Sequence, residues 1–124
     1  NQTVPTATVR LRKAATGRAK KDTVLEDAGV GDGPVDAALK AIDRLTETRG
    51  RLKDYSLRGV SQGKDALGEV SLKVDFGDGE LVTGKGASTD VIEASAKAYL
   101  NAVNRHLNSR LRKKPARKNA KGQP

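Results

Sequence analysis

The feature that most constrains the fold is an order of segments that occurs twice along the chain. Each half has segments with alternating apolar residues, then a Gly-x-Gly turn, then a stretch whose apolar residues have helical spacing. The halves span about residues 6–49 and 50–108, and such a repeat predicts an α+β fold made of two similar sheet-plus-helix units. A chain of 124 residues with 35% hydrophobic content is expected to hold both units in one domain, residues 1–111.

Strand and helix signals are clear in the first half. Ala7, Val9 and Leu11 alternate with polar residues, which predicts a half-buried strand, and residues 24–28 form a weaker strand candidate. Pro34 suits the first turn of a helix, and we expect that helix to end at Gly50. Helical spacing predicts the buried stripe of this helix: Val35, Ala38, Leu39, Ile42 and Leu45.

The second half predicts three strands, near residues 52–61, 66–76 and 80–86, with a hairpin turn at 77–79. Residues 88–90 supply caps for a longer helix, and Glu93 follows Asp90 at capping-box spacing. The small residues Ala94, Ala98 and Ala102 form one face that can approach a neighbour closely. The larger apolar residues predict the buried stripe of this helix: Ile92, Ala96, Tyr99, Val103 and Leu107.

The net charge of +9 lies at the two ends of the chain. Residues 1–21 and 105–124 contain Lys and Arg but no acidic residue, whereas the segment between them holds all fifteen acidic residues. The dense charge and Pro115 predict that residues 112–124 are a disordered basic tail. Nucleic-acid binding is disfavoured because aromatic residues that could stack on bases are not interleaved with the basic ones.

Composition argues against several other classes. The sequence has no Cys and one His, so a thiolate metal site is excluded and we expect no resident metal or cofactor. No apolar run could span a bilayer and residues 1–5 are not signal-like, so we expect a cytoplasmic protein without membrane contacts. Asp65, Glu69, Asp90 and His106 occupy ordinary turn, strand and helix-end positions, so we expect no catalysis by this chain alone.

Several motifs in a fixed order resemble the C-terminal regulatory domain of 2-isopropylmalate synthases, over about residues 6–106. The order and spacing make the resemblance specific, although each motif alone would be weak. The motifs are Gly31-Asp32-Gly33-Pro34-Val35-Asp36-Ala37-Ala38, Leu52-Lys53-Asp54-Tyr55, Gly63-Lys64-Asp65-Ala66-Leu67-Gly68-Glu69-Val70, Gly84-Lys85-Gly86, Thr89 to Tyr99, and Asn104-Arg105.

The resemblance implies two β-β-β-α units related by a pseudo-twofold axis, with leucine bound as feedback inhibitor at a homodimer interface. Relatives carry one more strand ahead of residues 6–13, so the first unit is expected to lack its first strand. The catalytic barrel of the family, which acts on acetyl-CoA and a 2-oxoacid with a divalent metal, is a separate region. The expected partners are therefore leucine, a second copy of this domain and the catalytic domain of the parent synthase.

The resemblance also implies which residues contact leucine. From the residues alone, the glycine loop before the first helix is either a tight turn or a cradle for a carboxylate. Asp36 is either the partner of the ligand ammonium or a first-turn acid favoured by the helix dipole, and Tyr55 is either a pocket or a core residue. The implied site consists of Gly31, Gly33, Pro34, Val35, Asp36, Leu52, Tyr55, Gly59, Ala66 and Val91.

Two alternatives stay open at this point. The related domain of citramalate synthases responds to isoleucine, and the position of one methyl group is worth only ~1–3 kcal/mol of discrimination. A basic nucleic-acid-binding module is the more remote alternative, and steep salt dependence of its affinity would distinguish it.

Overall fold

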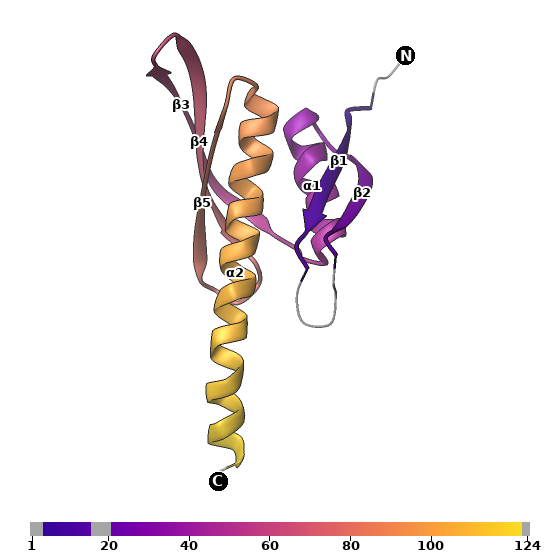
Figure 1. Cartoon of the computed structure of the whole chain (residues 1–124), viewed down its shortest axis with the longest axis vertical. Helices are drawn as coiled ribbons and strands as arrows, with labels where there is room; N and C mark the ends of the chain where they lie inside the picture. Colours follow the sequence, from indigo (N-terminus) through magenta and orange to yellow (C-terminus); the bar gives the residue numbers. More distant parts are fainter. Residues whose placement is uncertain (1–3, 16–20, 123–124) are drawn as a thin grey trace.

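The computed structural model describes the backbone of residues 4–15 and 21–122, and most side chains up to Arg112. It confirms the predicted α+β class, with two antiparallel sheets and two helices (Figure 1). The elements are β1 (Thr6–Lys13), β2 (Thr23–Val30), α1 (Pro34–Thr46), β3 (Arg51–Gln62), β4 (Asp65–Asp75), β5 (Leu81–Ser88) and α2 (Val91–Gly122).

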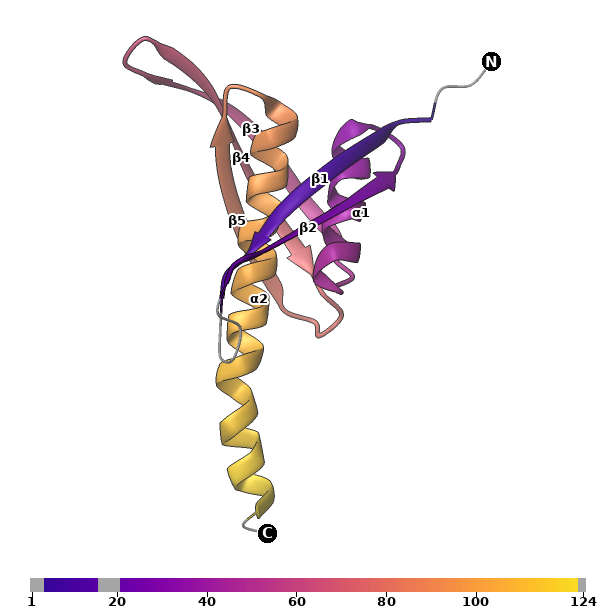
Figure 2. The same ribbon diagram turned by 45° about the vertical axis from the view of Figure 1, so that its right-hand side comes forward.

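Each helix covers the sheet of its own unit. Helix α1 packs on the two-stranded sheet β1-β2, and α2 packs on β4 and β5 of the three-stranded sheet β3-β4-β5. The two helices also pack on each other, so both lie between the two sheets (Figures 1 and 2). In the described part of the chain the first unit has two strands and the second has three, as the sequence predicts.

The segment at residues 24–28, which the sequence predicted only weakly as a strand, belongs to a full strand, β2. This strand pairs with β1 along its whole length. Its pattern is weak because Asp27 occupies a half-buried position on the face toward α1. Arg44 of α1 stabilises this position: its Nε lies 3.1 Å from Asp27 Oδ2, and its guanidinium donates to the Ala28 carbonyl. An ion pair therefore replaces an apolar contact between β2 and α1.

Helix α1 begins as predicted at Pro34, after Gly33 in the N-cap position, but ends earlier than predicted. Gly50 was expected to end it, and that expectation is wrong. Glu47 caps the helix in the left-handed conformation with φ 56°, and the Thr48 amide donates to the Asp43 carbonyl at 3.0 Å. The chain then crosses to β3 within residues 47–50, a short connection between the two units.

The core is built mainly on β4 and α2. Val70, Leu72 and Val74 of β4 are fully buried and pack against Tyr99 and Val103 of α2. The turn at residues 77–79 is the predicted hairpin, with two glycines at positive φ. Ile92 was expected in the buried stripe of α2. That expectation is wrong, because Ile92 lies in the first turn of the helix and is 40% exposed.

The small-residue face of α2 packs against the chain's own β5. Ala94, Ala98 and Ala102 are fully buried. A Cβ added to Gly86 would lie 2.6 Å from the Ala98 amide nitrogen, and one added to Gly84 would overlap the Ala98 carbonyl. The neighbour that this face approaches closely is therefore the sheet of the same unit, and the glycines of the Gly84-Lys85-Gly86 motif permit that approach.

The two helices begin with equivalent contacts. Val35–Asp43 of α1 aligns without gaps with Ile92–Leu100 of α2, and each segment carries an i,i+4 ion pair in its first turns. Lys40 Nζ lies 3.1 Å from the Asp36 carboxylate, and Lys97 Nζ lies 3.4 Å from that of Glu93. The internal repeat predicted from the sequence is therefore visible in side-chain contacts.

Helix α2 runs from Val91 to Gly122 and so includes most of the residues predicted to be a disordered basic tail. Lys, Arg, Ala and Leu dominate residues 110–122 and favour helix, although Pro115 opposes it. The disorder of residues 112–124 stays a prediction. Among the described residues, no helix is both long and apolar enough to cross a membrane.

Candidate functional site

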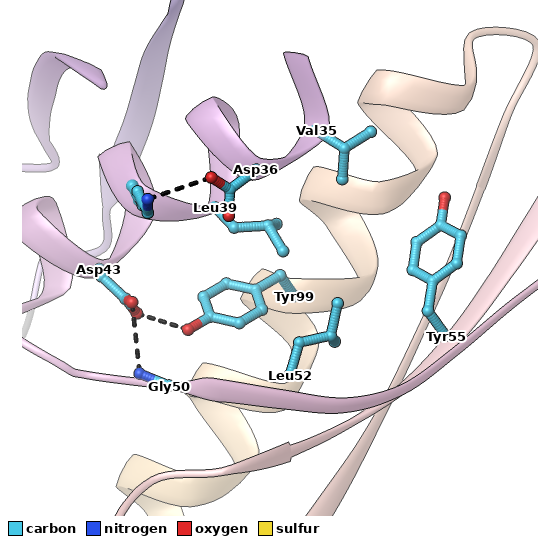
Figure 3. Close-up of a pocket in the computed structure, with 9 residues that line it drawn as sticks. Val35, Asp36, Leu39, Asp43, Gly50, Leu52, Tyr55 and Tyr99 are labelled. Atoms are coloured by element: carbon cyan, nitrogen blue, oxygen red, sulfur yellow. Dashed lines mark hydrogen bonds and ion pairs between the residues drawn. The ribbon is translucent and has the colours of Figure 1, made fainter. Parts of the chain in front are cut away.

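A cavity of about 420 Å³ opens between the two units (Figure 3). Helix α1 forms one wall, the beginning of β3 forms the opposite wall, and α2 contributes Tyr99. Its size is within the range of small-molecule sites, and its lining combines apolar walls with a few charged groups. The lining residues are Val35, Asp36, Leu39, Lys40, Asp43, Gly50, Leu52, Tyr55 and Tyr99.

The α1 wall combines an apolar surface with an acid and a base. Val35 and Leu39 present aliphatic side chains, while Asp36 and Lys40 are half-exposed and form an ion pair. The Asp36 carboxylate also accepts the backbone N–H of Asp32 at 2.9 Å. The Asp32 amide, and to a smaller extent Lys40, lower the pKa of Asp36 below its ordinary value of 3.8, so this wall carries a carboxylate at neutral pH.

The β3 wall depends on a bulge. Leu52 and Tyr55 are three residues apart and would lie on opposite faces of a regular strand. The register between β3 and β4 shifts between Leu52 and Asp54, so that Leu52 opposes Val74 and Tyr55 opposes Leu72. Both side chains therefore face the helices. Ser95 of α2 shares a hydrogen bond of 2.7 Å with the Tyr55 hydroxyl, which fixes the tyrosine ring beside α2.

One end of the cavity is a hydrogen-bonded group around Asp43. The Tyr99 hydroxyl donates to Asp43 Oδ1 at 2.6 Å, and the Gly50 amide donates to Asp43 Oδ2 at 3.3 Å. Tyr99 is only 1% exposed. Burial, together with the hydrogen bond to the Asp43 carboxylate, raises the pKa of Tyr99 far above its ordinary value, so the phenol stays a donor at any physiological pH.

Four residues predicted for the site line this cavity: Val35, Asp36, Leu52 and Tyr55. Gly31, Gly33 and Pro34 lie just outside it, at the N-terminus of α1. The Gly31 amide donates to the Pro5 carbonyl at 3.1 Å, so that amide is engaged within the chain. Gly33 precedes the helix in an extended conformation, and a Cβ there would meet nothing within 4 Å.

Gly59, Ala66 and Val91 are not brought to the cavity within one chain. Gly59 pairs with Gly68 in the β3-β4 hairpin, Ala66 pairs with Ser61 closer to its tip, and Val91 begins α2. A Cβ on Gly68 would lie 3.6 Å from Val91 Cγ2, so these positions share one region. Three large apolar side chains in that region are exposed: Leu57, Val91 and Ile92.

Sequence reasoning missed five lining residues: Leu39, Lys40, Asp43, Gly50 and Tyr99. Lys40 and Asp43 could have been found, because they follow Asp36 at i+4 and i+7 and so share its helix face. The sequence indicated a core position for Tyr99 and a helix end for Gly50. Only the packing of α2 on the connection between the units brings these two residues to the cavity. Among the described residues, no group of three or more potential metal ligands gathers.

Two sheet-plus-helix units with a mixed apolar and charged cavity between them define a class of small two-unit α+β domains. The chain belongs to the LeuA allosteric (dimerisation) domain family, whose model matches residues 1–107. Among curated relatives, it is 55% identical over 104 residues to a 2-isopropylmalate synthase of Methylacidiphilum infernorum, with 84% of this chain and 19% of the relative covered.

Two further relatives are also 2-isopropylmalate synthases. The one from Carboxydothermus hydrogenoformans is 52% identical over 84% of this chain and 19% of its own length. The one from Heliobacterium modesticaldum is 51% identical over 82% of this chain and 18% of its own length. The chain therefore spans about one fifth of the length of the relatives that it matches.

Proposed function

We propose that this chain is the leucine-sensing allosteric domain of a cytoplasmic 2-isopropylmalate synthase and has no catalytic activity of its own. The cavity between the units carries this proposal, since it joins aliphatic walls to an acid and a base on one helix face. An amino acid with a branched aliphatic side chain needs this combination. The family membership and the named relatives support the same assignment.

We propose one orientation for leucine in the cavity. Its isobutyl group would contact Val35, Leu39 and Leu52, and its ammonium group would pair with Asp36, whose lowered pKa keeps it ionised. The ligand carboxylate would then face the N-terminus of α1, near Gly33, where the helix dipole favours negative charge. Lys40 would shift from Asp36 toward solvent or toward that carboxylate.

A ligand in this cavity would contact both units at once, and this is the basis of the proposed allostery. Inhibition requires that leucine bind one arrangement of the units better than another. The catalytic region of the parent synthase, with its divalent metal and acetyl-CoA, would respond to this change in the arrangement of the units. In a twofold homodimer, the region around Gly59, Ala66 and Val91 of one protomer would complete the cavity of the other, which accounts for their distance from it within one chain.

Calorimetric titration of the chain with leucine, isoleucine and valine tests the proposal. We expect leucine to bind most tightly, with an affinity that changes little between 50 and 300 mM salt. Tighter binding of isoleucine would assign the isoleucine-responsive role instead. Absence of binding by all three amino acids, combined with nucleic-acid binding that weakens steeply with salt, would contradict the proposal.

Sedimentation equilibrium tests the proposed pairing. We expect a dimer at tens of micromolar protein, strengthened by leucine because a ligand that contacts both protomers binds only the assembled form. A monomer under all of these conditions, in a sample that binds leucine, would show that the cavity is complete within one chain.

A further inference from the structure

One carboxylate holds together three parts of the chain at one end of the cavity. Asp43 of α1 accepts the Tyr99 hydroxyl of α2 at 2.6 Å, the Thr48 hydroxyl at 3.0 Å and the Gly50 amide at 3.3 Å. The bond to Tyr99 is the only side-chain hydrogen bond between α1 and α2 in the part of the chain that the structure describes. Beside the apolar packing of the two helices, this bond is a polar contact that fixes their relative position.

Packing around this hydrogen bond is close on the side of Gly50. A Cβ on Gly50 would overlap the Tyr99 hydroxyl and would lie 2.7 Å from Val74 Cγ1, so the backbone of the connection rests directly on the phenol. The other side of the Tyr99 ring faces Phe76, with ring centroids 6.2 Å apart. Tyr99 is therefore held between the connection and the core of the second unit, and its hydroxyl reaches Asp43 of the first unit.

We infer that the Tyr99–Asp43 hydrogen bond sets the width of the cavity and so determines both affinity and selectivity for the branched-chain amino acid. Its geometry supports this role, since α1 forms one wall and the residues after Gly50 lead into β3, the opposite wall (Figure 3). This inference rests on the proposed function. It assigns Tyr99 and Asp43 as positioning residues, acting through the placement of Val35, Leu39 and Leu52.

Tyr99→Phe tests the inference, because it removes the hydroxyl and keeps the ring that lines the cavity. We expect the affinity for leucine to fall about tenfold, and the ratio of leucine to valine affinity to fall at least threefold, because a wall free to move fits both ligands alike. Asp43→Asn keeps an acceptor oxygen in the same place and is expected to retain more of the affinity and selectivity than Asp43→Ala.

Val103→Ala is the matched control. Val103 is fully buried in the core of the second unit and does not line the cavity, so this variant lowers stability without touching the hydrogen bond. All titrations are made at a temperature at which circular dichroism shows each variant to be folded. Val103→Ala is expected to bind leucine and valine with the affinities of the parent chain.

The outcomes separate the inference from the proposed function. If the parent chain binds none of the amino acids, both fail. If the parent chain binds leucine and Tyr99→Phe keeps the same affinity and selectivity, the proposed function stands and the inference is overturned. Should Tyr99→Phe not fold, Asp43→Asn and Asp43→Ala decide: equal selectivity in both variants and the parent chain would overturn the inference, and graded loss would support it.

Discussion

Gly29 meets Ala41 of α1 in the same way that Gly86 meets Ala98 of α2. A Cβ on Gly29 would lie 2.8 Å from the Ala41 amide nitrogen, and one on Gly86 would lie 2.6 Å from that of Ala98. In both units, therefore, a glycine on the last strand brings the sheet into direct contact with the backbone of the helix. This shared contact sets the distance between sheet and helix in the two units.

The first prediction follows from this contact. Gly86→Ala is expected to lower the free energy of unfolding by about 2–3 kcal/mol, because the new methyl group meets helix backbone that must move away. Gly59→Ala is the matched control, since a Cβ there meets nothing within 4 Å and alanine restricts the unfolded chain more than glycine does. Urea unfolding at one protein concentration measures both. Equal stabilities of the two variants would contradict the close contact.

Gly31→Asp and Gly33→Asp are expected to differ in stability. Neither glycine has a positive φ, so backbone strain does not enter. A Cβ on Gly31 would overlap the Asp36 carboxylate and lie 2.6 Å from the Ala37 amide nitrogen, so Gly31→Asp is expected to destabilise the fold. Gly33→Asp places a favourable acceptor at the N-cap of α1 and is expected to raise the melting temperature slightly.

Both variants are nevertheless expected to weaken leucine binding, by about 100-fold, because the added carboxylate repels that of the ligand. Gly33→Asp is the more informative of the two, since it separates binding from folding. Gly33→Ala is its uncharged control and should keep most of the affinity. A Gly33→Asp variant that is more stable than the parent and still binds leucine equally well would place the ligand carboxylate elsewhere.

Alkaline pH is expected to destabilise the domain through Tyr99. Its pKa is raised in the folded state above the ordinary value of 10.0, so the unfolded chain releases the phenol proton first as the pH rises. The resulting stability is fully present below pH 10 and decreases above it. Chemical unfolding between pH 8 and 11 should show this decrease, and Tyr99→Phe should make it smaller. The same decrease in Tyr99→Phe as in the parent would assign it to other groups.

Removal of residues 113–124 is expected to leave the leucine affinity within twofold of the parent value. All lining residues of the cavity lie between Val35 and Tyr99, and the deleted segment carries dense like charge. Titration of the shortened chain, with its helical content checked by circular dichroism, measures this. Loss of binding in a shortened chain that remains folded would give the C-terminal segment a role in the site.

Local patterns predicted the elements of the described residues, and they failed in detail where a distant contact decides the outcome. Alternation and helical spacing located each described strand and both helices. Gly50 was interpreted as a helix end because glycine favours that position, whereas its actual role is to make room for Tyr99, far along the chain. Ile92 has the correct spacing for the core but lies in a turn of α2 that the sheet does not cover.

The candidate site was predicted in part for the same reason. Four residues from the motifs that carry the family resemblance meet in one cavity: Val35, Asp36, Leu52 and Tyr55. The Asp43–Tyr99 hydrogen bond joins residues 56 positions apart, and no periodicity within either helix indicates it. The bulge that turns Leu52 and Tyr55 to one face is likewise a property of the paired strands, not of β3 alone.

The short connection at residues 47–50 joins the two units at one end of the cavity. Asp43, Gly50 and Tyr99 lie beside the crossing of the chain, whereas Val35 and Tyr55 lie at the far end of the same cavity (Figure 3). A rotation of one unit about this corner would move Val35 away from Tyr55 while the separation at the crossing changed little. One angle between the units would then govern the aperture of the cavity.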